Sequence, residues 1–133
     1  MPSDDLRRNV VILACAVSAG IHGALVPEHL GESTGAGVGF VAATVLLAAL
    51  AALVTYRPTL PVLLLAGACF AGLVVAWVGA VTTGVPILHP GREAIDGLAL
   101  FTKAVELGGL VAVAGLLRRP LRRLSSDHVK GLT

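Results

Sequence analysis

The segment that decides the fold runs from residue 36 to residue 56 and reads AGVGFVAATVLLAALAALVTY. It contains no charged side chain. Its length matches the roughly 20 apolar residues that a helix needs to cross a hydrocarbon core of about 30 Å. Three further stretches of similar length are largely apolar, at residues 10–26, 60–85 and 95–117. The sequence therefore predicts an all-α, polytopic membrane protein with a four-transmembrane-helix bundle, in which residues 1–133 form a single transmembrane domain.

The composition of the whole chain agrees with membrane insertion. Hydrophobic residues make up 56% of the 133 residues, charged residues make up 14%, and the mean hydropathy is +0.88. A soluble domain is usually about 45–50% apolar with Gly counted in, and about 25% charged. These values exclude a disordered chain, a nucleic-acid-binding module and an ordinary soluble enzyme. The expected partner is the lipid bilayer, and no nucleic acid is expected.

The first span also has the features of a cleaved signal peptide, because Arg7 and Arg8 precede an apolar run. The small-residue sites that would suit cleavage come early in this run, before an apolar region of about 7–15 residues is complete. The run then continues to Val26, and Pro27 follows it. We therefore expect a retained helix that ends near Val26.

The basic residues predict the orientation of the spans. Only Arg92 lies near the loops that join the first span to the second and the third to the fourth. Cytoplasmic segments carry an excess of Lys and Arg, so both termini and the link at residues 57–59 are predicted to be cytoplasmic. The chain is expected to be a multi-pass protein of the cell (plasma) membrane. Eight basic residues support this orientation: Arg7, Arg8, Arg57, Arg118, Arg119, Arg122, Arg123 and Lys130.

The segment at residues 118–133 is predicted to be a basic cytoplasmic tail. Attraction to anionic lipid is worth about 1 kcal/mol per basic residue near the surface. The residues expected to contact lipid in this way are Arg118, Arg119, Arg122 and Arg123.

Small side chains are expected where the helices pack closely, because lipid gives helices no hydrophobic drive to associate. Ridges of Ala and Gly occur at helical spacing, although the abundance of these residues explains the ridges equally well. The cysteines Cys15 and Cys69 fall in apolar runs and are expected to be free thiols. The ridge residues are Ala16, Gly20 and Ala24, then Gly35 and Gly39, and finally Ala104, Gly108 and Ala112.

Ionisable residues inside the spans require an explanation, since they are costly in lipid and usually face the protein interior or a cavity. At a rise of about 1.5 Å per residue, His22 lies about 7 Å deep, Lys103 about 12 Å and Glu106 about 16 Å. Asp96, at the mouth of the fourth span, lies on the same helix face as Lys103 and Glu106. The residues are predicted to share one outward-opening pocket. Lys103 and Glu106 also have the spacing of an ion pair whose role is only structural.

A second polar group lies in and near the predicted outer loops. Imidazole and carboxylate side chains suit zinc, copper(II) or iron. We expect His22, Glu28 and His29 to be metal ligands, with Zn or Cu as the candidate cofactor. The alternative is that these are solvated loop residues beside a hydrogen-bonded His22. Further candidates in the outer loops are Glu32, His89 and Glu93.

Residues 19–30 read AGIHGALVPEHL, which contains the pattern HxxLxPEHL. This pattern resembles a segment of small four-span membrane proteins of high-GC Gram-positive bacteria, and residues 97–107 are loosely similar to their fourth helix. The His followed by Pro also gives a looser likeness to DoxX-like four-span proteins. The resemblance implies an extracytoplasmic His/Glu feature at the end of the first span and implies no particular activity.

The sequence favours a non-enzymatic membrane protein, an accessory subunit of a larger membrane complex or a homo-oligomer. Its outward-facing His/Glu pocket would bind a divalent metal or a small polar ligand. The alternative is a proton- or ion-coupled transporter in which Glu106 titrates and Lys103 is its counter-ion. A membrane-embedded enzyme with His22 as base is the least favoured hypothesis, since no set of nucleophile, base and orienting group can be assembled.

Overall fold

The computed structural model describes the backbone of residues 2–84 and 91–130, and the side chains of residues 3–84 and 91–118. These residues form four helices: α1 (Pro2–Glu32), α2 (Thr34–Tyr56), α3 (Leu60–Thr82) and α4 (Gly97–Lys130). Each helix is long and apolar enough to cross a membrane. The prediction of an all-helical protein with four helices of spanning length is confirmed.

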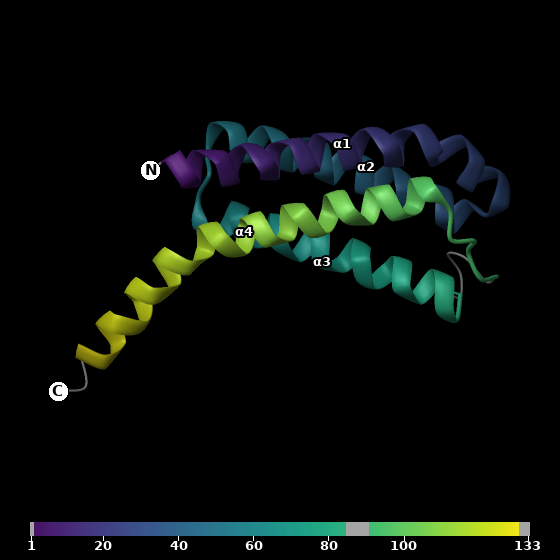
Figure 1. Ribbon diagram of the computed structural model, residues 1–133. Helices are drawn as coiled ribbons and strands as arrows, with labels where there is room; N and C mark the ends of the chain where they lie inside the picture. The colour runs from purple at the N-terminus through teal and green to yellow at the C-terminus, as the bar shows by residue number, and fades with distance from the viewer. Residues whose placement is uncertain (1, 85–90, 131–133) are drawn as a thin grey trace.

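The helices lie side by side along most of their length (Figure 1). Helix α1 packs most extensively against α2, and α4 packs against both α1 and α3, whereas α2 and α3 share few contacts. One end of the molecule holds the N-terminus, Arg57 and the point where α4 leaves the other helices, and we call it the Arg57 end. The opposite end holds the α1–α2 turn and Glu93, and we call it the Glu93 end.

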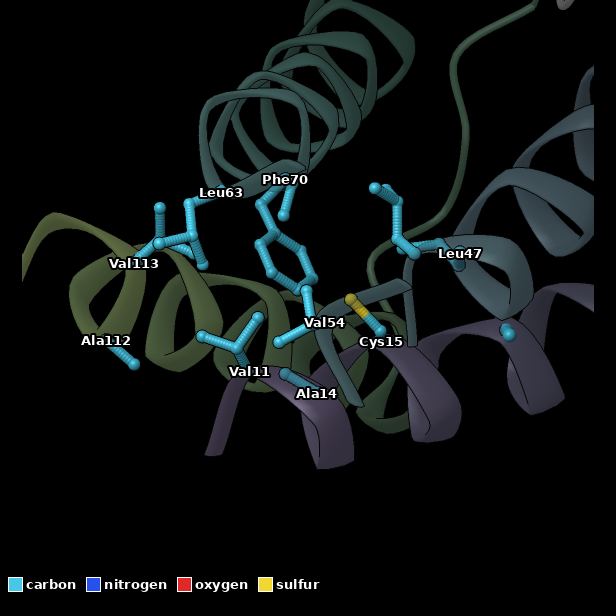
Figure 2. Packing of buried hydrophobic residues seen from close by; sticks show 12 residues of the cluster. Val11, Ala14, Cys15, Leu47, Val54, Leu63, Phe70, Ala112 and Val113 are labelled. Atoms are coloured by element: carbon cyan, nitrogen blue, oxygen red, sulfur yellow. The ribbon is translucent and has the colours of Figure 1, made fainter. Parts of the chain in front are cut away.

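The apolar core lies toward the Arg57 end and is centred on Phe70 of α3, which is fully buried. Figure 2 shows the Phe70 ring among side chains from the other three helices, including Val11 and Val54. Gly109 of α4 allows this close approach. A Cβ atom at Gly109 would lie 2.6 Å from Cε2 of Phe70 and 2.8 Å from Cβ of Ala14.

The central glycines of two predicted ridges of small residues do not make helix contacts, whereas Ala112, in the same ridge as Gly108, is buried in the core. A Cβ atom added at Gly20 or Gly108 would meet no atom within 4 Å. Close contacts are made instead by other glycines. Gly109, next to Gly108, contacts Phe70, and Gly23 contacts Thr44. Gly67 of α3, where no ridge was predicted, contacts Val113. On helices that are apolar all round, sequence spacing alone does not indicate which face meets a neighbour.

Helix α1 does not end at Val26 but continues through Pro27 to Glu32. Proline lacks the backbone N–H, so continuation costs one helical hydrogen bond, in addition to the steric conflict of its ring with the preceding turn. Two residues later, Nδ1 of His29 donates to the carbonyl of Leu25, 3.1 Å away. The continued helix places His22 and His29 on the same side of α1, where both rings contact Phe40 of α2.

The boundary between α1 and α2 follows a capping rule. Ser33 alone separates α1 from α2, and its hydroxyl accepts a hydrogen bond of 3.0 Å from the N–H of Ala36. Helix α3 ends at Thr82, three residues before the predicted end of its span. Helix α4 begins at Gly97 and continues beyond the predicted span into the basic tail, as far as Lys130.

Candidate functional site

Among the side chains that the structure describes, the most deeply buried charged one is that of Glu106, which is 0% exposed in the first third of α4. Its two carboxylate oxygens have separate partners. The hydroxyl of Ser18 on α1 donates to Oε1 over 2.8 Å, and Nζ of Lys103 donates to Oε2. We call Ser18, His22, Lys103 and Glu106 the Glu106 cluster.

Lys103 joins this cluster to a third helix. Its ammonium group forms the ion pair with Glu106 and also lies 3.5 Å from the backbone carbonyl of Leu73 on α3. Lys103 is 9% exposed, so both charges of the pair are withdrawn from the surroundings. Charges at this depth persist only when they are paired or face a cavity, and here they are paired.

His22 completes the cluster from α1 and is 7% exposed. Its Nδ1 lies 2.8 Å from the carbonyl oxygen of Ser18, which can only accept, so Nδ1 carries the hydrogen. In the neutral ring Nε2 therefore holds the lone pair. This Nε2 lies 4.0 Å from Oε1 of Glu106, which is longer than a hydrogen bond.

His29, one heptad further along α1, repeats this geometry toward the Glu93 end. Its Nδ1 donates to the carbonyl of Leu25, and its Nε2 lies 3.7 Å from Oε1 of Glu93. The ring of Phe40 stacks on His29 with a centroid separation of 3.7 Å and lies tilted at 5.2 Å from the ring of His22. Two imidazoles thus face two different carboxylates along one side of α1.

The predicted metal ligands are not brought together. Glu28 is exposed at the end of α1, whereas His29 faces Glu93 and His22 faces Glu106. Among the described side chains, at residues 3–84 and 91–118, no three from His, Cys, Asp or Glu form a group that could hold a metal ion. The described residues therefore give no observation in favour of a Zn or Cu site.

The remaining predicted site residues have separate positions. Asp96 does not lie in the pocket: it is exposed, and its carboxylate caps α4 by accepting a hydrogen bond of 2.7 Å from the N–H of Ala99. Glu32 is exposed at the end of α1. His89 lies outside the described residues, as do the side chains of Arg119, Arg122 and Arg123, while Arg118 is exposed.

Beside the Glu106 cluster lies a cavity of about 210 Å³ with walls from α1, α2, α3 and α4. Most of its wall is apolar and includes the rings of Phe40 and Trp77. Its polar wall residues include His22 and Lys103, and also Glu93, whose side chain is 28% exposed. The cavity therefore extends from the Glu93 end to the depth of the Glu106 cluster.

Sequence reasoning missed Ser18, Phe40 and Trp77. Ser18 precedes His22 by four residues and so lies on the same face of α1, which was the available signal for its role. Phe40 and Trp77 stand in apolar runs, where an aromatic side chain carries no indication of whether it faces lipid or a cavity. Cys15 and Cys69 are free thiols, as predicted.

The cluster contains the side chains of a hydrolytic triad but not its arrangement. In a triad the serine hydroxyl gives its proton to histidine, and the acid holds the other ring nitrogen. Here the hydroxyl of Ser18 donates to Glu106, and Nδ1 of His22 donates to a backbone carbonyl. The geometry suits the binding and neutralisation of charge rather than nucleophilic attack.

The fold and this site define an all-helical protein with four helices apolar enough to span a membrane and a buried ion pair beside a cavity. Comparison with protein-family models, curated proteins and solved structures found no match to the chain. The resemblance of residues 22–30 to small four-span proteins of high-GC Gram-positive bacteria stays a prediction.

Proposed function

We propose that this chain is an integral membrane protein that binds a small molecule in the cavity beside the Glu106 cluster. One observation carries the proposal, namely that the cavity of about 210 Å³ has the buried side chains of Lys103 and His22 in its wall. Ligand sites are typically concave and mostly apolar, with a few polar groups that fix orientation. The ligand classes expected from the sequence were a divalent metal and a small polar ligand. The mostly apolar wall supports a small organic molecule with a polar group rather than a metal ion.

The proposed orientation places the Glu93 end outside the cell. The basic residues Arg7, Arg8, Arg57 and Arg118 all lie at the opposite end of the molecule, which supports a cytoplasmic Arg57 end. The cavity would then take its ligand from the outer side of the cell membrane. Action as an accessory subunit or homo-oligomer, and lipid contact by the tail arginines, remain predictions of the sequence.

Occupancy of the cavity can be measured through Trp77, because it is the only tryptophan of the chain and lies in the cavity wall. The probes are 4-fluoroacetophenone and 1-ethyl-4-fluorobenzene, titrated into the protein in nanodiscs. Ala43 lies in the wall, whereas the neighbouring Ala42 is exposed and lies about 100° further around α2, outside the cavity wall. Ala43→Leu should weaken binding of any bound probe at least tenfold, and Ala42→Leu should leave it unchanged.

The proposal fails if neither probe changes the fluorescence of Trp77 beyond the change seen with free tryptophan in empty nanodiscs. It also fails if Ala43→Leu and Ala42→Leu weaken binding equally, since the probe would then be dissolved in lipid near the protein.

A second candidate function, ion-coupled transport, is favoured by the surroundings of Glu106. This carboxylate is 0% exposed and is paired with Lys103, and the imidazole of His22, a second titratable group, has its Nε2 4.0 Å from Oε1 of Glu106. Under this candidate, Lys103→Leu/Glu106→Leu should fold stably in liposomes but lose proton-coupled uptake of the bound molecule. Uptake that persists in the stable double variant would leave Glu106 with a structural role only.

A further inference from the structure

The cavity wall carries information about the chemical class of its ligand. The size of the cavity is the first indication. An apolar cavity of about 150 Å³ accepts benzene. The cavity of about 210 Å³ therefore has room for one aromatic ring with a small substituent.

The wall is suited to a flat, apolar body. Phe40 of α2 and Trp77 of α3 both line the cavity, and α2 and α3 share few contacts. Aromatic rings pair through offset-stacked or edge-to-face contacts, which add to the free energy of simple area burial. A ring placed between these helices would supply contacts that α2 and α3 do not make with each other.

The polar end of the cavity offers a hydrogen-bond donor. The ammonium group of Lys103 has three donor hydrogens. Two of its neighbours are the carboxylate of Glu106 and the carbonyl of Leu73. The side chain also lies in the cavity wall, so an acceptor oxygen of a ligand is a chemically suitable third partner.

The charges at the inner end of the cavity disfavour an ionic ligand beside Lys103. Lys103 is already neutralised by Glu106, and a cation beside Lys103 would face its ammonium group. An anion at Lys103 would compete with Glu106 and leave a buried carboxylate without its counter-ion, which is strongly destabilising. An uncharged acceptor leaves the pair of Lys103 and Glu106 in place.

We infer that the ligand is an uncharged, single-ring aromatic molecule that bears one hydrogen-bond-accepting oxygen, which accepts from Lys103. This inference rests on the proposed function, because it names the ligand class of the same cavity.

The test compares three probes of similar size by ¹⁹F NMR in nanodiscs. 4-Fluoroacetophenone has an uncharged acceptor, 1-ethyl-4-fluorobenzene has none, and 4-fluorobenzoate has a charged one. Because the ammonium group of Lys103 is a charged donor, the ketone should bind about tenfold or more tightly than the hydrocarbon. The benzoate should bind more weakly than the ketone.

The variant Lys103→Leu/Glu106→Leu removes the donor without leaving an unpaired charge. In this variant the preference for the ketone over the hydrocarbon should fall below about threefold, with the hydrocarbon still bound. A preference that is unchanged in the double variant would overturn the assignment to Lys103. If this variant does not fold, the three probes on the wild-type protein still decide the ligand class.

The outcomes separate the inference from the function on which it rests. Equal binding of ketone and hydrocarbon to the wild-type protein, or tighter binding of the benzoate, overturns the ligand class and leaves the cavity as a binding site. Binding of none of the three probes overturns both.

Discussion

At the scale of single residues, the burial of Glu106 determines what substitutions should do to stability. Glu106→Leu would leave the ammonium of Lys103 buried beside an apolar group, and Lys103→Leu would leave the carboxylate with Ser18 as its remaining donor. Breaking a buried pair from one side costs about 3–5 kcal/mol, whereas replacing both members by apolar residues is often neutral. Each single variant should therefore lower the thermal unfolding temperature in detergent, and the double variant should recover most of the loss.

Glu28→Leu is the matched control, because Glu28 is an exposed carboxylate near the end of α1. It should change the unfolding temperature little. Full stability of both Glu106→Leu and Lys103→Leu would contradict a buried ion pair between these side chains.

The residues of the site were predictable to different degrees. The pairing of Lys103 with Glu106 follows from their i, i+3 spacing on one helix, which is a local property. The bond from Ser18 to Glu106 joins residues 88 positions apart, so it depends on how α1 is rotated against α4. Asp96, predicted in the pocket, instead caps α4; an Asp directly before a helical run is a start signal that the sequence contains.

At the scale of the helices, the contact of α4 with α1 and α3 depends on Gly109. In Gly109→Ala the new methyl group would overlap the ring of Phe70 and the Cβ atom of Ala14, and Ala14 has no side-chain freedom with which to move away. Overpacking of this kind typically costs about 1–3 kcal/mol. We expect a lower unfolding temperature, measured by circular dichroism in detergent.

Gly108→Ala provides the control within the same helix turn, because a Cβ atom there meets nothing within 4 Å. It should be neutral or slightly stabilising, since Ala favours helix more than Gly does. Equal effects of the two substitutions would show that α4 does not present Gly109 to α1 and α3.

The helices were more predictable than their faces. Length and hydropathy are properties of each segment alone, so they can be read from the sequence. Helix α2 begins two residues before its predicted span and ends at the predicted residue, Tyr56. The end of α1 was less predictable, because Pro27 weakens a helix by an amount that contacts elsewhere can offset. Gly20 and Gly108 were expected at helix interfaces but lie away from them. Their positions could not be predicted, because a helix that is apolar all round carries no sequence signal for its rotation.

At the scale of the whole molecule, the distribution of charge predicts the topology in the cell. Ser33 and Gly91 lie at the Glu93 end, and Ser126 lies on the part of α4 that extends beyond the Arg57 end. Cysteines at positions 33 and 91 should react with an impermeant maleimide added to intact cells, and a cysteine at 126 should react only after lysis. The reverse pattern would invert the proposed orientation.

The central claim is that a cavity leads from the Glu93 end to the Glu106 cluster, and α2 offers two neighbouring positions that test it. Ala43 lines the cavity and Ala42 does not, yet both lie about 13 Å along α2 from its first residue. The measurement uses Ala43→Cys and Ala42→Cys in a chain with Cys15→Ala and Cys69→Ala. A cationic, membrane-impermeant methanethiosulfonate reagent is then added to intact cells.

The cysteine at 43 should be modified, because thiols react as thiolates where water reaches them. The cysteine at 42, in the lipid-facing surface, should not be modified. Saturation with 4-fluoroacetophenone should slow the reaction at 43. Modification of Ser33→Cys in the same cells, with positions 43 and 42 equally unreactive, would contradict a cavity that opens at the Glu93 end.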